Sequence, residues 1–157
     1  MKVNKMKNGI IVCIVLLVCI FIPACASVPK FDDVKNRDWK LAEVHVNSEN
    51  ITIERSEYTA AGFGEIFTLR FDDERISGVG APNRYFAPYR LVDKQGIAIN
   101  TIAGTLMIAL FEPEKFKEHT FFVLLQNAYR WNLSGKNLEL HSKGESGSEA
   151  VLIFAPR

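Results

Sequence analysis

The feature that most constrains the fold is a set of short runs in which large apolar side chains alternate with polar ones. In the clearest run, Phe67, Leu69 and Phe71 are separated by Thr68 and Arg70. Every second side chain of an extended strand points to the same face of a sheet, so the three apolar side chains are expected to share a buried face. Many runs of this kind predict a sheet with one face in the core and the other in water.

Similar runs recur along the chain, with turn residues between them. We expect about seven or eight strands, from apolar positions at 39–46, 67–71, 76, 85–91, 97–99, 129–133, 138–140 and 151–154. Ile51 and Ile53 add a very short alternation, and the small residues of 56–64 predict a loop. The spacing of Leu41 and Val44 indicates a bulge in the first strand. Pro88 lacks an N–H, so its strand is expected to lie at an edge or to bulge there.

One helix is expected between the strands. Phe111-Glu112-Pro113-Glu114 is typical of a helix start, because proline suits the first helical position and acids suit the positive end of the helix dipole. The helix should run to about Gln126 and bury one broad apolar face. With the strands, it predicts a mainly antiparallel α+β domain.

The N-terminal residues predict export and a lipid anchor. Lys2, Lys5 and Lys7 precede an apolar run at 10–22, which is too short for the roughly 20 residues of a membrane span and is typical of a signal peptide. The next residues, Ile22-Pro23-Ala24-Cys25, resemble the lipobox of bacterial lipoproteins, in which the cysteine receives a diacylglyceryl group before cleavage. In many bacterial lipoproteins an Asp after the cysteine retains the protein at the inner membrane, so the resemblance implies that this chain, with Ala26 there, moves to the outer membrane.

These signals divide the chain into a signal peptide at 1–24, a tether at 25–37 and a domain at 38–157. An ordered N-terminal arm is the alternative to the tether. Cys25 would be the only one of the three cysteines to remain after cleavage, so the domain has no cysteine for a disulfide. Removing three of the 19 basic residues leaves 16 against 18 acidic ones, which gives no reason to expect nucleic acid as a partner.

The order and spacing of several motifs resemble the META domain family, which includes the heat-shock protein HslJ. The motifs run from Phe71 through Gly80-x-x-Asn83-Arg84-Tyr85-Phe86, Ile102-Ala103-x-Thr105-x-Met107 and the helix to Ile153-Phe154, and cover about 38–154. The resemblance implies an antiparallel structure that curves like a partly open barrel, with a helix packed against it. It also implies a link to stress response, antibiotic resistance and virulence, but no defined molecular activity.

The chain departs from the family pattern at two positions. Many members have Gly-Cys-Asn in the first motif and a second cysteine two residues after the Met of the second motif. Here Ala81, followed by an inserted Pro82, stands near the first cysteine, and Ala109 stands near the second. If these cysteines pair in relatives, both halves of the disulfide are missing here, and a redox role does not transfer.

Candidate site residues are few. His45, His119 and His141 lack metal-ligand spacing, Asp72-Asp73-Glu74 suits a hairpin turn, and neither a nucleophile elbow nor a phosphate loop is present, so we expect no metal, cofactor or catalytic set. The remaining candidate surface combines arginine with aromatic residues, types that are enriched at binding hot spots. Its residues are Asn83, Arg84, Tyr85, Tyr89 and Arg90. Core packing of the aromatic residues is the alternative.

The sequence therefore leaves three functional hypotheses. The first is a non-enzymatic, lipid-anchored envelope module that binds a protein partner, with a role in stress protection or assembly. The second is a carrier or sensor of a small hydrophobic ligand, because partly open barrels can hold one. This hypothesis depends on whether Phe67, Leu69, Phe71 and Trp131 line a void or fill the interior. The third, an enzyme, requires titratable groups that converge in a pocket.

Overall fold

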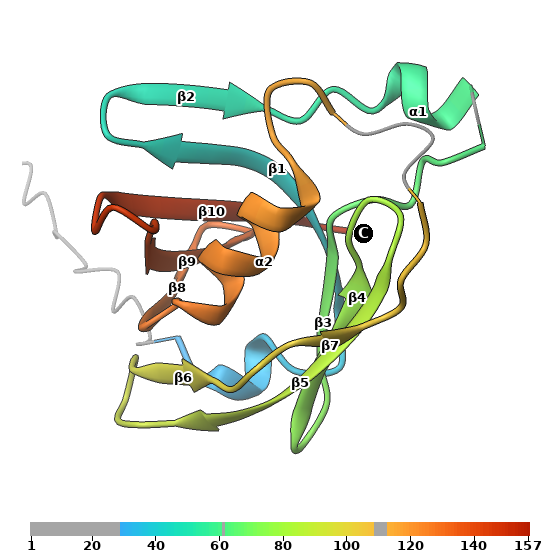
Figure 1. The fold of residues 1–157 in the computed structure, drawn as a ribbon. Coiled ribbons are helices and arrows are strands. Elements are labelled where there is room, and N and C mark those ends of the chain that lie inside the picture. The colour runs from blue at the N-terminus through green and yellow to red at the C-terminus, as the bar shows by residue number, and fades with distance from the viewer. Residues whose placement is uncertain (1–28, 61, 109–112) are drawn as a thin grey trace, which may run out of the picture.

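A computed structural model describes residues 29–60, 62–108 and 113–157 (Figure 1). In chain order, the elements are η1 (Phe31–Asp33), β1 (Asp38–Val46), β2 (Glu49–Thr52), α1 (Ser56–Ala60), β3 (Thr68–Phe71), β4 (Arg75–Val79), β5 (Arg84–Leu91), β6 (Ile97–Ile99), β7 (Ala103–Gly104), α2 (Glu118–Gln126), β8 (Arg130–Ser134), β9 (Asn137–Lys143) and β10 (Glu149–Pro156). No helix in these ranges is long and apolar enough to cross a membrane.

The strands form one strongly curved antiparallel sheet. Eight of them follow the order β6-β5-β4-β3-β1-β10-β9-β8, while β2 pairs with β1 and β7 pairs with β5 outside this path. The two ends of the path meet at a bridge between Gly96 and Arg130. There, the Ile97 N–H donates to the Tyr129 carbonyl at 3.1 Å, and the Trp131 N–H donates to the Gln95 carbonyl at 2.9 Å. The expected mainly antiparallel, barrel-like α+β fold is confirmed.

The bulge expected in the first strand explains how β1 serves two neighbours. The pairing register with β10 shifts between Leu41 and Glu43. Before the shift, residues 38–40 of β1 pair with β3, and after it residues 43–46 pair with β2. At the bulge itself, the Ala42 carbonyl accepts a hydrogen bond from the Ile53 N–H at 2.9 Å. The bulge thus turns β1 away from β3 and opens a place for β2.

Pro88 lies in a strand with neighbours on both sides, so the expectation of an edge strand is wrong. On one side of β5, Pro88 is opposite Arg75 of β4. On the other side, β5 pairs with β7 through Phe86 and with β6 from Tyr89 onward, and Pro88 lies between these two pairings. Its carbonyl accepts from Asn100 at 2.9 Å on that side. The missing N–H therefore falls where the strand changes partner and disrupts neither pairing.

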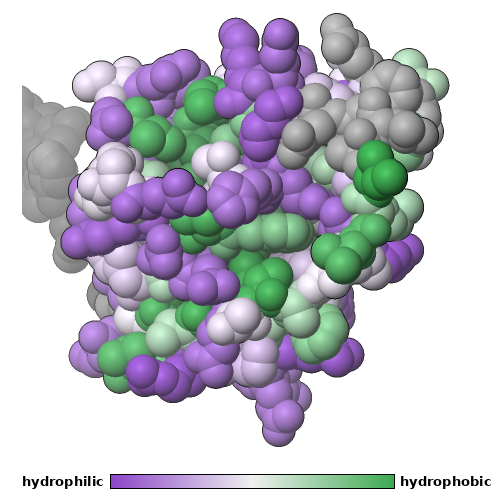
Figure 2. Space-filling view, in the orientation of Figure 1, coloured by the Kyte–Doolittle hydropathy of each residue, from purple (hydrophilic) through white to green (hydrophobic). Residues whose placement is uncertain are grey.

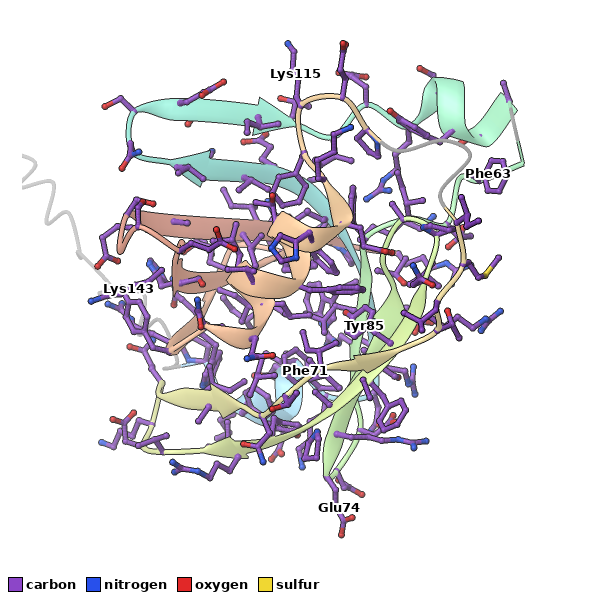
Figure 3. All side chains as sticks on the ribbon, viewed as in Figure 1. Phe63, Phe71, Glu74, Tyr85, Lys115 and Lys143 are labelled. Carbon is purple, nitrogen blue, oxygen red and sulfur yellow. The ribbon has the colours of Figure 1, made fainter. Side chains whose placement is uncertain are left out.

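Aromatic rings fill the barrel in two clusters. Phe67, at one end of β3, contacts Phe121 of α2 with ring centroids 5.0 Å apart. Phe71, at the other end of β3, contacts Phe31 of η1 at 5.2 Å, and Phe31 also contacts Trp131 at 5.1 Å. The side chains of Phe67, Leu69, Phe71 and Trp131 are all at most 1% exposed. They fill the interior rather than line a void, and Figure 3 shows Phe71 among the inward-pointing side chains.

The helices differ from the sequence prediction in where α2 begins and in the presence of a second short helix. The helix α2 ends at Gln126 as expected, but it begins at Glu118, because the chain bends at 114–116 and Lys117 is still extended. Phe116 packs on Phe67 before the helix starts, with centroids 5.3 Å apart. The expected start at 111–112 lies outside the described residues. In addition, part of the expected loop 56–64 forms the short helix α1.

Part of the expected tether also belongs to the folded domain. Phe31 is 8% exposed and Val34 is fully buried, and the Val34 carbonyl accepts the indole N–H of Trp39 at 3.1 Å. The Asn36 N–H donates to the Phe71 carbonyl at 2.9 Å. Residues 31–36 therefore form an ordered arm, which was the alternative to a tether. The sequence did not predict this arm, because Phe31 and Val34 are single apolar residues among polar ones and give no periodic pattern.

A candidate binding groove beside the open edge of β7

The structure divides the five candidate residues between different surfaces. Side chains alternate along β5, so Tyr85 and Tyr89 point inward, while Arg84 and Arg90 are exposed on the outer face. Asn83, just before the strand, is only 7% exposed. The five side chains therefore form no common surface, and Tyr85 is shown pointing into the barrel (Figure 3).

The hydroxyl groups of the two inward tyrosines tie β5 to β3 and to the turn that follows β3. The Tyr85 hydroxyl donates to the Thr68 carbonyl at 2.7 Å, and the Tyr89 hydroxyl donates to the Asp72 carbonyl at 2.8 Å. Burial raises the pKa of Tyr85 well above its ordinary value, because the phenolate would have no water around it. Burial also raises the pKa of Tyr89, which is only half-buried. These roles are structural.

Asn83 and Glu118 join the turn after β4 to the start of α2. One carboxylate oxygen of Glu118 accepts the backbone N–H groups of Ala81 at 2.5 Å and Asn83 at 2.7 Å. The other oxygen accepts the Asn83 side-chain amide at 2.7 Å. Gly80 permits this close approach, since a Cβ there would lie 2.4 Å from the Glu118 carboxylate.

The same asparagine also holds the segment that follows β7. Its amide oxygen accepts the Thr105 hydroxyl at 2.9 Å and the Met107 N–H at 2.7 Å. Its amide nitrogen reaches the Met107 carbonyl at 3.4 Å. Asn83 thus connects the turn, α2 and residues 105–107, and all of its polar capacity is used within the protein. This explains why an asparagine suits the first motif without giving it a role in binding or catalysis.

A groove of about 480 Å³ lies between α2 and the segment 102–106. Its apolar lining comes from Ile102, Leu106, Phe122 and Val123, while His119, Gln126 and Asn127 supply polar groups. Glu118 and Asn83 also line it, so the junction they form fixes the distance between its two walls. In Figure 2, apolar side chains gather in the middle of this face, around the position of α2 in Figure 1, and at its right-hand side.

One wall of the groove is the unpaired edge of β7. Thr105 donates its N–H to the Arg84 carbonyl at 3.0 Å, so the hydrogen-bonding groups of Thr105 face β5. Gly104 alternates with it and is opposite Tyr85, which makes the Gly104 N–H and C=O point away from β5, toward α2. Within the described ranges, neither Gly104 group has a hydrogen-bond partner. On the same side, the Ile102 N–H donates to the Gln126 side chain at 3.3 Å.

Beyond this edge, the chain exposes three consecutive large apolar side chains. Leu106 is 100% exposed, Met107 58% and Ile108 87%. The Met107 backbone is nevertheless held by Asn83, so the side chains are presented from a fixed segment. The sequence did not reveal them, because a short apolar run is normally expected to be a buried strand. Three such side chains together on a surface are typical of an interaction site.

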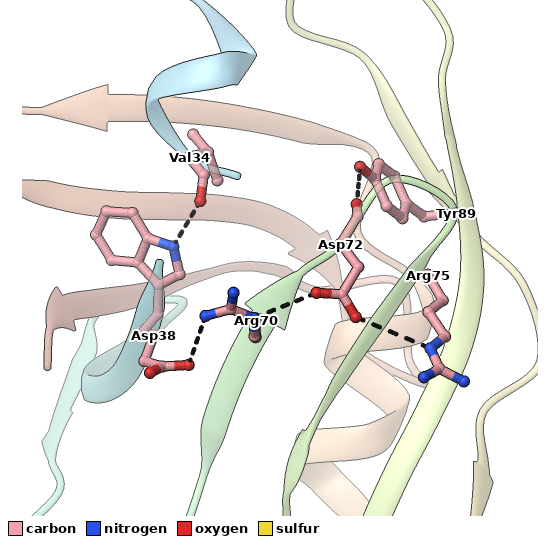
Figure 4. Close-up of polar contacts among 7 residues, drawn as sticks. Val34, Asp38, Arg70, Asp72, Arg75 and Tyr89 are labelled. Carbon is pink, nitrogen blue, oxygen red and sulfur yellow. Dashed lines mark hydrogen bonds and ion pairs between the residues drawn. The ribbon is translucent and has the colours of Figure 1, made fainter. Parts of the chain in front are cut away.

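Several arginines on the outer face of the sheet form ion pairs within the protein. Arg70 lies 3.2 Å from Asp38 and 3.2 Å from Asp72, and Arg75 lies 3.9 Å from Asp72 (Figure 4). Arg157 similarly pairs with Glu65 at 3.1 Å. This ladder of alternating charges accounts for Asp72 as a turn and ion-pair residue. In the described residues, no group of three His, Cys, Asp or Glu side chains is placed to hold a metal ion.

Comparisons with known proteins show the family and fold but no activity. The META domain model matches residues 32–155. The structure is similar to the NMR structure of a protein from Burkholderia xenovorans, with a TM-score of 0.58, 16% identity and 99% of each chain covered. It is also similar to a DUF4847 family protein from Bacteroides vulgatus ATCC 8482, with a TM-score of 0.51, 15% identity and coverage of 80% of this chain and 95% of that one. No curated protein gives a significant match.

Proposed function

The chain belongs to the META domain family, and we propose that it is a lipid-anchored, non-enzymatic module of the cell envelope that binds a protein partner. The partner places an extended segment in the groove between α2 and β7. The signal-like residues 1–24 and the lipobox-like sequence around Cys25 support an anchor in the outer membrane. The single observation that carries the binding role is the open β7 edge beside three exposed apolar side chains.

An extended peptide suits both features of the groove. An unpaired strand edge offers N–H and C=O groups that a second strand can pair with, and such edges are otherwise protected in natural sheets. Here, the edge at Gly104 lies opposite the apolar wall of Phe122 and Val123, which can receive alternate side chains of the added strand. Leu106 belongs to the other wall of the groove, and Ile108 extends the apolar contact beyond it.

The other two hypotheses have less support. A ligand inside the barrel would have to displace Phe67, Phe71 or Trp131, whose side chains fill the interior. For an enzyme, the best polar cluster is that of Asn83, Glu118 and Thr105. Its hydrogen-bonding groups are directed at the turn, the helix start and each other rather than at the groove. We therefore propose binding without catalysis.

Proline and alanine at position 104 provide a matched test. Both substitutions add the same Cβ, which would lie 3.2 Å from the Arg84 carbonyl, but only proline removes the N–H that points into the groove. In the full chain in its host, a photo-reactive amino acid at Leu106 should form an adduct with a defined protein. The adduct should persist in Gly104→Ala and be lost in Gly104→Pro.

A photo-reactive amino acid at Lys136 serves as the positional control, because this exposed residue lies in the turn between β8 and β9. If the Lys136 position gave the same adduct, or if Gly104→Pro gave the same yield as Gly104→Ala, partner binding at this groove would be refuted.

A further inference from the structure

We propose that the end of the barrel closed by η1 rests on the lipid bilayer, through the turn between β5 and β6. The inference depends on the lipid anchor at Cys25 that is part of the proposed function, but not on the partner groove. In this orientation of the domain on the membrane, one barrel end contacts lipid, and the groove beside α2 remains accessible from the aqueous side.

Chain length places this end of the barrel near the membrane. The four peptide units from Cys25 to Pro29 span at most about 14 Å when fully extended. Two residues later, Phe31 is buried, with its ring 5.1 Å from that of Trp131 and 5.7 Å from that of Tyr89. The arm is therefore fixed to the barrel end formed by these residues. An acyl chain on Cys25 would hold that end within the same short distance of the lipid surface.

The turn between β5 and β6 lies at this end and exposes apolar side chains. Leu91 is only two residues beyond Tyr89 and is 42% exposed, and Val92 is 57% exposed. The turn closes with the Val92 N–H donating to the Gly96 carbonyl at 3.0 Å, next to the bridge between Gly96 and Arg130. Leu91 and Val92 can enter the interfacial region while the turn backbone keeps its own hydrogen bonds.

Charge distinguishes this side of the barrel end from the opposite side. Arg90, Lys94 and Arg130 are exposed around the β5–β6 turn, and cationic side chains suit the headgroups of anionic phospholipids. Asp93 is the acid of this turn, and its carboxylate accepts the N–H groups of Gln95 at 2.9 Å and Gly96 at 2.5 Å. These two hydrogen bonds lower its pKa.

By contrast, the turn between β3 and β4 exposes Asp73 and Glu74, and Glu74 points into solvent at the lower edge of Figure 3. Lipid contact at that turn would bring carboxylates against anionic headgroups. The domain should therefore lean on β5–β6 and keep β3–β4 in water. The contact can be weak by itself, because the anchor gives it a high effective concentration.

Spin labels at single introduced cysteines can test this orientation in the full lipoprotein. The protein is reconstituted in vesicles of phosphatidylethanolamine and phosphatidylglycerol, and nitroxides are attached in Val92→Cys, Leu106→Cys and Glu74→Cys. All three positions are exposed. Membrane-dissolved oxygen should reach the label at 92 in preference to a water-soluble nickel chelate. The ratio of oxygen to nickel accessibility at 92 should be several-fold higher than at 106 or 74.

A second variant tests the contact itself. Leu91→Glu should lower the oxygen preference at 92 toward the value at 106, while the protein stays bound to vesicles through its lipid. If labels at 92, 106 and 74 were equally aqueous in vesicle-bound protein, the orientation would be wrong and the anchor would stand. If the protein did not bind vesicles at all, the anchor and the orientation would both be overturned.

Discussion

The two ends of the barrel are closed by different chemistry, although the sheet presents similar residues at each. Phe67 and Tyr85 face one end, and Phe71 and Tyr89 face the other. At the first end, α2 is held by the carboxylate and amide groups of Glu118 and Asn83, together with its apolar face. At the second, η1 contributes the single ring of Phe31, which contacts three aromatic residues of the sheet.

The way in which each end of the barrel is closed fits the role that we propose for that end. Hydrogen bonds are directional, so the polar junction of Asn83 and Glu118 fixes α2 relative to residues 105–107. The groove between these two segments requires such a fixed arrangement. The Phe31 ring, which we call the aromatic plug, packs on its neighbours without such directionality. It nevertheless fixes the arm that leads toward Cys25. We expect substitutions in the plug to change global stability and substitutions in the junction to change the groove as well.

The largest effect should come from removing the plug. Phe31→Ala empties a ring-sized volume among Phe71, Tyr89 and Trp131 and should lower the free energy of unfolding by about 3 kcal/mol. Phe86→Ala is the matched control, because Phe86 is 49% exposed on the outer face and should cost less than about 1 kcal/mol. Urea unfolding of both variants measures the difference. Equal losses would show that η1 does not close the barrel.

A smaller loss is expected at the polar junction. Asn83→Ala leaves the Met107 N–H and part of the Glu118 carboxylate without their partner, which should cost about 2 kcal/mol. Unlike Phe31→Ala, it should also shift the amide resonances of residues 105–107 in NMR spectra. Asn132→Ala in β8 removes a half-buried asparagine bonded to Glu139 and serves as the control. Unchanged resonances at 105–107 would refute the connecting role of Asn83.

The smallest effects should come from the two tyrosine hydroxyls. Tyr85→Phe removes a hydrogen bond to a β3 carbonyl, and Tyr89→Phe removes one to the Asp72 carbonyl just after β3. Each should cost about 1 kcal/mol at neutral pH. At alkaline pH they should differ. Both pKa values are raised in the folded state, so the stabilisation is complete below the ordinary value of 10.0 and is lost as pH rises above it.

Because burial raises the pKa of Tyr85 further, Tyr85→Phe should flatten the alkaline fall in stability more than Tyr89→Phe does. Urea unfolding at a series of pH values above neutrality measures the two slopes. A steeper fall in Tyr85→Phe than in Tyr89→Phe would contradict this difference between the two ends.

The alternating pattern was enough to predict most of the sheet. Strands such as β3 and β9 have one buried and one partly exposed face, so the period of two appears directly in the sequence. The bulge near Ala42 was visible for the same reason, because an extra residue changes which positions are apolar. Pro88 was misleading, since its missing N–H is harmless only where β5 changes partner, and the sequence does not show partners.

The candidate site was much less predictable. Asn83 and Tyr85 were grouped with Arg84 as surface residues, yet burial depends on α2 and on residues 105–107, which are distant in sequence. The groove combines β7, which has only two residues, with one side of a helix. Neither element carries a periodic signal for an open edge. Composition also favours a buried position for Leu106 and Ile108, and only the fold shows that they are exposed.

Phe67 illustrates how one position can satisfy two opposing demands on its amino acid. Its backbone has φ of 51°, a left-handed conformation in which a bulky side chain costs roughly 1–2 kcal/mol. Glycine would relieve that strain, but it would remove a fully buried ring, and losses of this kind cost about 3–5 kcal/mol. The aromatic residue therefore prevails despite its backbone. Across related sequences, this site should tolerate other large apolar residues and disfavour glycine, even though its dihedral angles alone would suggest the opposite.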